Sequence, residues 1–455
     1  MAKRDPRVAG MDPSISLVTD YAVPVVTPPS KFHMQAAVPT ASHLSVQPGA
    51  AVAAEARSAA RGGYAYYQQA LSGERLPAAF VDLDVFAANL ELLRQRAGGM
   101  PIRLVTKSVR SVGVLKRILS CGPTFQGLLC YSAGEAAWLA AQGFDDLVVA
   151  YPSVEPSEVH AVAAQIRAGR SITLMVDGVE QVKKLSLLAQ SEQVTLPVSI
   201  DLDMSSDYPG IHFGVFRSPV TSPDAALALA GEIAIRPGLR LEGLMGYEGQ
   251  IAGLMDDVPG QAVKNRILRL LKRKSIAEVN QRRSDTVSAL KRAGHNLRFV
   301  NGGGTGSFES TRQDPSVTEL AAGSGLYAPT LFDHYTAFRA RPAAGFALPV
   351  TRLPKQGIVT CSGGGYCASG PAGKSRLPTP WLPEGCGLLD NEGAGEVQTP
   401  VRVSPSAGLR VGDPVFFRHA KAGELCERFN ELLLIQGGRI VDRVKTYRGD
   451  GQCFF

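Results

Sequence analysis

The sequence has no long apolar run, no paired cysteines and no strong excess of one charge. None of its apolar stretches reaches the roughly 18 residues that a membrane-spanning helix requires, and the N-terminus lacks the continuous apolar core of a secretory signal. The seven cysteines are scattered and never follow a CxxC spacing, which argues against a disulfide framework and a cysteine-rich zinc site. These absences predict a cytoplasmic protein without a membrane partner.

The positive charge is modest, and part of it is concentrated in one segment. The formal net charge is +7, and residues 264–274, with Arg282 and Arg283 beyond them, are rich in basic side chains. Apolar residues recur inside this segment at helical spacing, so we expect an amphipathic helix with a basic outer face. No aromatic residues are interleaved there to stack on bases, and the sequence therefore predicts no nucleic-acid partner.

The composition changes along the chain. With 455 residues, of which 45% are hydrophobic and 20% charged, the chain fits a globular protein of two or three domains. Residues 1–62 contain scattered prolines and an alanine-rich run, which predict an extended or partly disordered N-terminal arm. In residues 345–455, short apolar runs alternate with Gly/Pro-rich turns and helical spacing nearly disappears, so an all-β C-terminal domain is predicted there.

Residues 75–340 alternate between short, β-rich apolar runs and helix-like stretches. Eight largely apolar runs, most of them followed by a helix, favour a closed parallel barrel over an open sheet. The length of the region matches a (β/α)8 TIM-type barrel of the α/β class. The predicted strands lie at residues 78–84, 102–106, 127–131, 146–151, 172–177, 196–203, 241–247 and 297–301.

Polar side chains stand at the ends of most of these predicted strands. The active site of such a barrel forms at the carboxyl ends of the strands, so we expect these side chains to meet on one rim. Lys107 is the most informative of them, because an amine partly withdrawn from water can attack a carbonyl and form a Schiff base. The others include Asp82, Asp84, Tyr131, Ser132, Asp201, Asp203, Tyr247, Glu248 and Asn301.

A glycine-rich segment follows the last predicted strand. Gly302, Gly303, Gly304, Thr305 and Gly306 leave backbone N–H groups uncovered, and free N–H groups beside hydroxyls can cradle a phosphate. A second turn of the same kind, residues 322–327, stands in a position to close this cradle. A phosphate cradle and a Schiff-base lysine on one rim indicate pyridoxal phosphate (PLP) as the cofactor.

These motifs together resemble the fold-type III PLP enzymes. The match rests on residues 80–84, 106–108, 246–250 and 302–306, and it is most similar to the D-threonine aldolase and D-serine dehydratase branch of the alanine racemase superfamily, which includes amino-acid deaminase/aldolase members. The resemblance implies that Lys107 carries the cofactor and that the phosphate and ring are held by Gly304, Thr305, Gly306, Gly323, Ser324, Tyr327 and Tyr247. It also implies a homodimer.

Two positions depart from the pattern of this branch. Its members carry a metal-binding His followed two residues later by Asp or Cys, whereas here His419 is followed by Lys421. A protonated lysine cannot bind a metal, so a divalent metal stays open, with His419 as one ligand and Glu424 or Cys426 as the second. Relatives also have an arginine in the loop 201–214, and here we expect His212 to take part of its role.

The resemblance implies a PLP-dependent lyase that acts on a β-hydroxy D-amino acid through an external aldimine. The reaction would be retro-aldol cleavage or dehydration with deamination, with His419 acting on the β-hydroxyl. The alternative is a PLP-dependent racemase, in which Lys107 and a tyrosine from the C-terminal domain of a second subunit would act as bases on opposite faces of the substrate. Tyr366 is the candidate for that tyrosine. A PLP-binding protein without strong catalysis would consist of a bare barrel, and the predicted β-domain argues against it.

Overall fold

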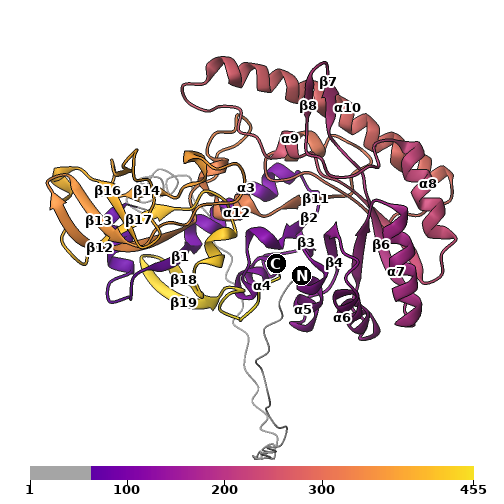
Figure 1. Cartoon of the computed structure of the whole chain (residues 1–455), viewed down its shortest axis with the longest axis horizontal. Helices are drawn as coiled ribbons and strands as arrows, with labels where there is room; N and C mark the ends of the chain where they lie inside the picture. The colour runs from indigo at the N-terminus through magenta and orange to yellow at the C-terminus, as the bar shows by residue number, and fades with distance from the viewer. Residues whose placement is uncertain (1–62, 455) are drawn as a thin grey trace, which may run out of the picture. The chain divides into compact units, whose positions relative to one another are not determined.

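The computed structural model describes residues 63–454 (Figure 1). The predicted arm, residues 1–62, lies outside the described residues. Among residues 63–454, no helix has both the length and the apolar character needed to cross a membrane.

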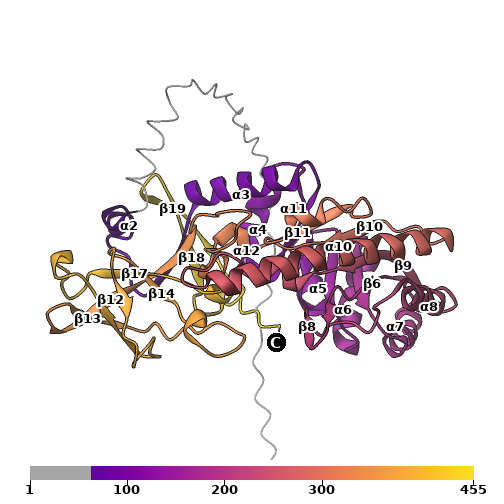
Figure 2. The ribbon, with the colours of Figure 1, turned by 90° about the horizontal axis from the view of Figure 1, so that it is seen from above.

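Eight parallel strands close into a barrel with helices outside it, which confirms the predicted TIM-type fold (Figures 1 and 2). The strands are largely buried, and this explains why their sequences read as continuous apolar runs rather than alternating ones. In chain order they are β2 (Ile102–Val105), β3 (Phe125–Cys130), β4 (Leu147–Pro152), β5 (Ile172–Val176), β6 (Leu196–Asp201), β9 (Leu239–Gly246), β10 (Phe299–Gly302) and β11 (Glu319–Ala322).

The helices that cover the barrel begin at ordinary capping residues. Ser111, Ser132 and Ser222 each accept a hydrogen bond from a backbone N–H in the first turn of the following helix. The predicted basic helix is confirmed as the 31-residue α10. The helices are α3 (Leu83–Ala97), α4 (Val112–Leu119), α5 (Ala133–Ala141), α6 (Pro156–Arg167), α7 (Val179–Ser191), α8 (Pro223–Ala234), α9 (Gly249–Ala252), α10 (Ala262–Arg292), α11 (Phe308–Thr311) and α12 (Ser324–Tyr327).

The prediction that residues 78–84 form the first barrel strand is wrong. That segment is β1 (Ala78–Asp82), which pairs antiparallel with β12 and parallel with β18 in the sheet of the second domain. The barrel closes instead through β11, where Leu320 faces Ile102 of β2. Because β1 and barrel strands such as β2 and β11 are buried along all or most of their length, their sequence patterns are alike.

The second domain is built on a nine-stranded sheet, as the sequence predicts for the C-terminal region. Seven strands follow the order β15-β16-β13-β12-β1-β18-β19, and β17 pairs with both β12 and β14. The short helix α2 (Tyr64–Ala70) packs on this sheet through Tyr67, whose ring centroid lies 5.0 Å from that of Phe80. The remaining strands are β12 (Ala344–Lys355), β13 (Ile358–Ser362), β14 (Thr379–Leu382), β15 (Gly387–Leu388), β16 (Gln398–Arg402), β17 (Pro414–Arg418), β18 (Glu431–Gln436) and β19 (Arg439–Lys445).

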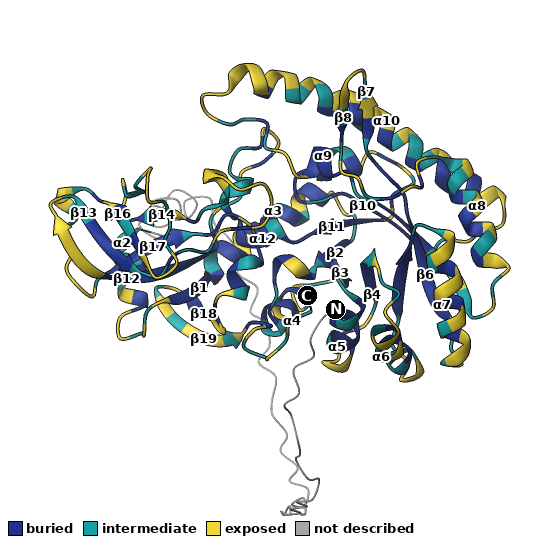
Figure 3. Ribbon diagram, viewed as in Figure 1, coloured by how far each residue is buried: buried dark blue, intermediate teal, exposed yellow. Residues whose placement is uncertain are grey.

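The amino end of the barrel is closed by a buried ion pair that the sequence did not indicate. Figure 3 shows the barrel strands as a largely buried layer inside the helices. Within it, Arg103 is 1% exposed and donates to Glu319 at 2.6 Å and to Asp146 at 3.0 Å. These residues lie near the starts of β2, β11 and β4, opposite the predicted active-site rim, so their role is structural.

Candidate active site

Lys107 lies at the carboxyl end of β2, in a short 3-10 turn formed by Thr106–Ser108. Its Nζ donates a hydrogen bond of 2.8 Å to the hydroxyl of Tyr151, which lies near the carboxyl end of β4 on the same rim. The side chain is exposed, so the expectation that this amine is withdrawn from water is wrong. The predicted position on the rim is nevertheless the observed one.

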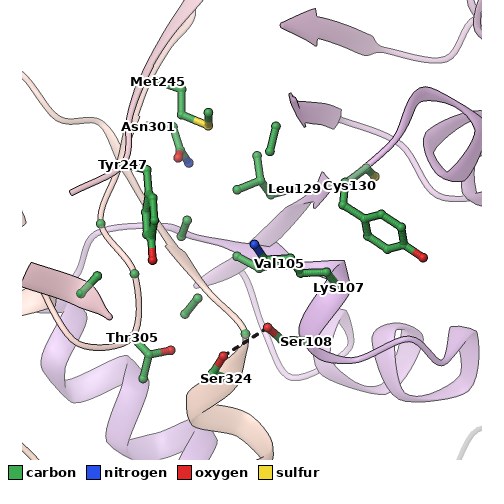
Figure 4. Close-up of a pocket in the computed structure, with 18 of the residues that line it drawn as sticks. Val105, Lys107, Ser108, Leu129, Cys130, Met245, Tyr247, Asn301, Thr305 and Ser324 are labelled. Carbon is green, nitrogen blue, oxygen red and sulfur yellow. Dashed lines mark hydrogen bonds between the residues drawn. The ribbon is translucent and has the colours of Figure 1, made fainter. Parts of the chain in front are cut away.

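A pocket opens around Lys107 at the carboxyl ends of the strands (Figure 4). The close-up shows the amine pointing into the space between Tyr247, Asn301, Thr305 and Ser324. Apolar side chains of Val105, Leu129 and Met245 form the floor. Of the predicted cofactor residues, the lining includes Lys107, Tyr247, Gly304, Thr305, Gly323 and Ser324.

Arg217 and Tyr151 also line the pocket, and neither was among the predicted site residues. Arg217 donates to the carboxylate of Asp201 at 2.7 Å and lies 4.7 Å from the ring centroid of Tyr151. Burial of Asp201 raises the pKa of its carboxyl to about 6, although the guanidinium opposes this shift. Tyr151 has its pKa lowered despite burial, because the cations Lys107 and Arg217 stabilise its phenolate form.

The loop 201–214 contains no arginine, but an arginine that follows it enters the pocket. Arg217 lies just beyond the segment 201–214, and the β7–β8 hairpin (Ser206–Tyr208 and Ile211–Phe213) precedes it. His212 sits in that hairpin, where its Nδ1 is 2.7 Å from Asp207 and its ring stacks on Phe216. It is not among the residues that line the pocket. Arg217 thus occupies the place at which His212 was expected.

The glycine-rich segment after β10 forms a tight loop against the pocket wall. Its backbone is held from behind by Glu248, which accepts the N–H of Gly303 at 2.9 Å and also binds Thr311. A side chain at Gly304 would press on Ala252 and Tyr247, so glycine allows the backbone to approach the pocket. Gly306 packs against Ala252 and Tyr335 and is not in the lining, so it shapes the loop from outside.

The second turn closes the cradle from the opposite side. Gly323 packs against Ser108 and the carbonyl of Val105, and the hydroxyls of Ser108 and Ser324 are 3.3 Å apart (Figure 4). Thr305 accepts the N–H of Gly325 at 3.1 Å, which ties the two turns together. Hydroxyls, exposed backbone and an amine in one pocket fit a phosphorylated aldehyde such as PLP. Tyr327 lies behind this wall, fully buried, with its hydroxyl donating to Val109.

The remaining predicted residues line a second cavity in the β-domain. His419, Tyr366, Lys421 and Glu424 share this cavity, and none of them lines the pocket around Lys107. His419 is 5% exposed, and neither ring nitrogen has a hydrogen-bond partner among the described residues. Burial lowers the pKa of His419 to about 3, so its imidazole is neutral near pH 7.

The loop that follows β17 lies against the rim of the Lys107 pocket. Gly423, with φ +81°, packs on the backbone of Lys107 so closely that a side chain there would overlap the Lys107 carbonyl. Tyr366 instead packs among aromatic rings of its own domain, with its ring centroid 5.1 Å from that of Phe346. The loop that carries His419 and Lys421 thus contacts the rim at Lys107, whereas Tyr366 packs within the β-domain.

The residues around His419 do not fit a divalent metal site. The carboxylate of Glu424 accepts the backbone N–H of Ser369 at 3.1 and 3.0 Å, so it neither contacts nor activates His419. Cys426 is buried and donates to the carbonyl of Val109, and burial raises the pKa of its thiol to about 12. Residues 63–454 contain no group of three His, Cys, Asp or Glu side chains arranged to hold a metal. We therefore derive no step through a metal.

Comparison with known proteins gives consistent matches. A 3-hydroxy-D-aspartate aldolase of Paracoccus denitrificans (strain Pd 1222) is 29% identical over 250 residues, which cover 54% of this chain and 59% of the relative. The chain thus spans well under two thirds of the length of that curated relative.

Two solved structures match over much longer segments. The D-threonine aldolase of Filomicrobium marinum superimposes with a TM-score of 0.70 at 21% identity, over 84% of this chain and 96% of that one. The D-threo-3-hydroxyaspartate dehydratase of Delftia sp. HT23 superimposes with a TM-score of 0.67 at 18% identity, over 83% of this chain and 98% of that one. At such identities these two matches establish the fold.

The family described as "Alanine racemase, N-terminal domain" matches residues 81–330. That segment contains the whole barrel, Lys107 and both turns of the cradle. Because the match covers more than half of the chain, this protein belongs to the alanine racemase N-terminal domain family.

Proposed function

We propose that this protein is a PLP-dependent lyase that acts on a β-hydroxy D-amino acid. The observation that carries the proposal is the pocket in which the Lys107 amine faces Thr305, Ser324 and the glycine-rich loop. The matched proteins support the substrate class, since they are named as aldolases and a dehydratase of D-3-hydroxyaspartate or D-threonine. When bound, PLP withdraws electrons from the substrate Cα so that a bond next to it can break.

The chain's own residues supply binding and proton transfer. Lys107 is the amine that would bind the cofactor aldehyde, and Tyr151, at 2.8 Å from it, fixes its direction. Ser108, Thr305 and Ser324 offer hydroxyls to the phosphate, and Tyr247 lies along the ring. Arg217 places a cation between Tyr151 and Tyr247, where it would contact the ring substituents. His419 has two ring nitrogens without a hydrogen-bond partner among the described residues, and one of them would accept the proton of the substrate β-hydroxyl, although the burial that lowers its pKa opposes this transfer.

An amino-acid racemase remains the second candidate, but the arrangement of bases favours the lyase. Racemisation needs a second base on the opposite face of the substrate from Lys107. Tyr366 is held in an aromatic cluster by Phe346 and Phe429, and burial raises its pKa, so it is a poor base in this position.

The first experiment tests cofactor binding. Protein reconstituted with PLP should be yellow, with a visible absorbance band that is absent from Lys107→Ala and retained in Lys355→Ala, a control at the exposed end of β12. A wild-type protein that stays colourless in excess PLP would contradict the proposal.

A second experiment identifies the reaction. D-threonine, D-threo-3-hydroxyaspartate, D-serine and D-alanine are added in turn to the reconstituted protein. Glycine and an aldehyde or glyoxylate indicate aldol cleavage, whereas ammonia and an oxo acid indicate dehydration. Exchange of the α-proton of D-alanine in D₂O with inversion, and no cleavage of any hydroxylated substrate, would favour the racemase.

A further inference from the structure

We propose that the ammonium group of Lys421 supplies the positive charge beside the substrate β-oxygen, so that this protein needs no divalent metal. The inference rests on the proposed lyase function and deepens it. The residues around His419 offer no second metal ligand, because Glu424 and Cys426 form hydrogen bonds elsewhere. The position two residues after His419 carries the cation of Lys421 instead.

Lys421 is held in a defined place by its surroundings. Its Nζ donates to the hydroxyl of Ser369 at 2.6 Å, and the backbone N–H of Ser369 is itself bound by Glu424. The same loop lies against the backbone of Lys107 through Gly423. Lys421 therefore lies on the loop that contacts the rim at Lys107, and we expect its ammonium to reach a substrate bound there.

The charge of Lys421 is not neutralised by a direct ion pair. Within residues 63–454, Lys421 forms no ion pair within 4 Å, and its hydrogen-bond partner is the neutral hydroxyl of Ser369. Two nearby arginines differ in this respect, since Arg418 pairs with Asp333 and Arg110 pairs with Glu427. Burial lowers the pKa of Lys421, and the more distant carboxylate of Glu424 opposes this shift. In its protonated form Lys421 thus keeps two ammonium hydrogens for an incoming anionic oxygen.

This placement gives Lys421 and His419 complementary tasks. The proton of the substrate β-hydroxyl would pass to a ring nitrogen of His419, and neither nitrogen has a partner among the described residues. The electron pair of the broken O–H bond stays on the β-oxygen, which becomes negative. A fixed ammonium next to that oxygen stabilises the developing charge, which is the contribution that a metal ion would otherwise make.

The first test measures metal and activity on the intact protein reconstituted with PLP. We expect far less than one divalent ion per chain by mass spectrometry, and lyase activity unchanged by EDTA. A stoichiometric bound metal, or activity that EDTA removes and Mn²⁺ restores, would overturn the inference. Absence of lyase activity with every hydroxylated D-amino acid would instead reject the proposed function. The metal content would still show, independently of activity, whether the protein binds a divalent ion.

The second test changes the cation. Lys421→Ala should lower kcat/KM about 100-fold with an unchanged PLP absorbance band, and Lys421→Arg should recover part of the loss. Lys374→Ala is the matched control, since Lys374 is an exposed lysine of the same domain that pairs with Asp390. Equal activity of Lys421→Ala and wild type would refute the role.

A third variant gives a readout that needs no catalysis. Lys421→Asp places a carboxylate two residues from His419, so we expect it to bind Mn²⁺ in calorimetry at a concentration at which wild type binds none. Mn²⁺ binding by wild type would contradict the inference directly. Failure of both proteins to bind would also count against it, because Lys421 would then not lie at the metal's position.

Discussion

Arg217 shows how a single side chain organises the pocket. It bridges Asp201, the carbonyl of Ala150 and the rings of Tyr151 and Tyr247, and so links the ends of three barrel strands. The sequence could not reveal it, because its position depends on the path of the loop after the β7–β8 hairpin. Lys107 was predictable, since a strand end alone fixes its place on the rim.

We expect Arg217→Leu to destabilise the protein and to weaken PLP binding. The substitution leaves the buried carboxylate of Asp201 without its partner, which costs about 3 kcal/mol in the free energy of unfolding. Urea unfolding of the apoprotein and PLP titration followed by absorbance would measure the two effects separately.

The double variant Arg217→Leu with Asp201→Leu is the control for this prediction. It removes both charges, so the free energy of unfolding should recover while PLP affinity stays low. Recovery of both quantities would show that Arg217 acts on the cofactor only through stability.

At the scale of elements, the two turns of the cradle act as one unit. Glu248 fixes the first turn from behind, and Thr305 joins it to the second through Gly325. The sequence located both turns because glycine and hydroxyl residues cluster after apolar runs. It misplaced β1 and missed β11 as a strand, since burial patterns of short strands do not say which sheet a strand joins.

Gly306→Ala tests the close packing of the first turn. A methyl group there would overlap the carbonyl of Ala252 and come within about 2.5 Å of the Tyr335 ring, so the loop must shift. We expect PLP affinity to fall at least about tenfold, which is the factor that 1.4 kcal/mol produces. Fluorescence titration of the apoprotein with PLP would measure the change.

Gly231→Ala provides the matched glycine control. Gly231 lies inside α8, where a methyl group would meet nothing within 4 Å. This variant should leave PLP affinity unchanged and raise the free energy of unfolding by up to about 1 kcal/mol. An equal loss of PLP affinity in both variants would contradict the packing argument for Gly306.

At the scale of the whole molecule, the two domains are joined by a buried carboxylate. Glu135 at the start of α5 accepts the N–H of Tyr131 at 2.7 Å and the hydroxyl of Tyr447 at 2.9 Å, so it ties the C-terminal segment to the barrel. Burial raises the pKa of Glu135 to about 7, although these hydrogen bonds oppose the shift. Its contribution to stability therefore depends on pH.

A raised carboxyl pKa makes the folded protein hold its proton more tightly than the unfolded chain does. Because the ordinary pKa of a glutamate carboxyl is 4.5, the benefit is complete below pH 4.5 and is lost as the pH rises through about 7. We therefore expect ionisation of Glu135 to lower the free energy of unfolding by about 3 kcal/mol as the pH rises from 4.5 to about 7. Urea midpoints of wild type and Glu135→Gln at several pH values would measure it, since the variant lacks this dependence. Parallel curves for the two proteins would contradict the prediction.

The position of β1 has a consequence for how the chain is made. Phe80 of β1 is paired with Leu433 of β18, so β1 waits for a strand that leaves the ribosome much later than β1 does. The nascent chain must carry an apolar, half-paired strand until β18 emerges, although the barrel strands are complete long before. Completion of the second domain therefore depends on β18, and a premature stop codon before residue 431 would leave β1 without its parallel neighbour.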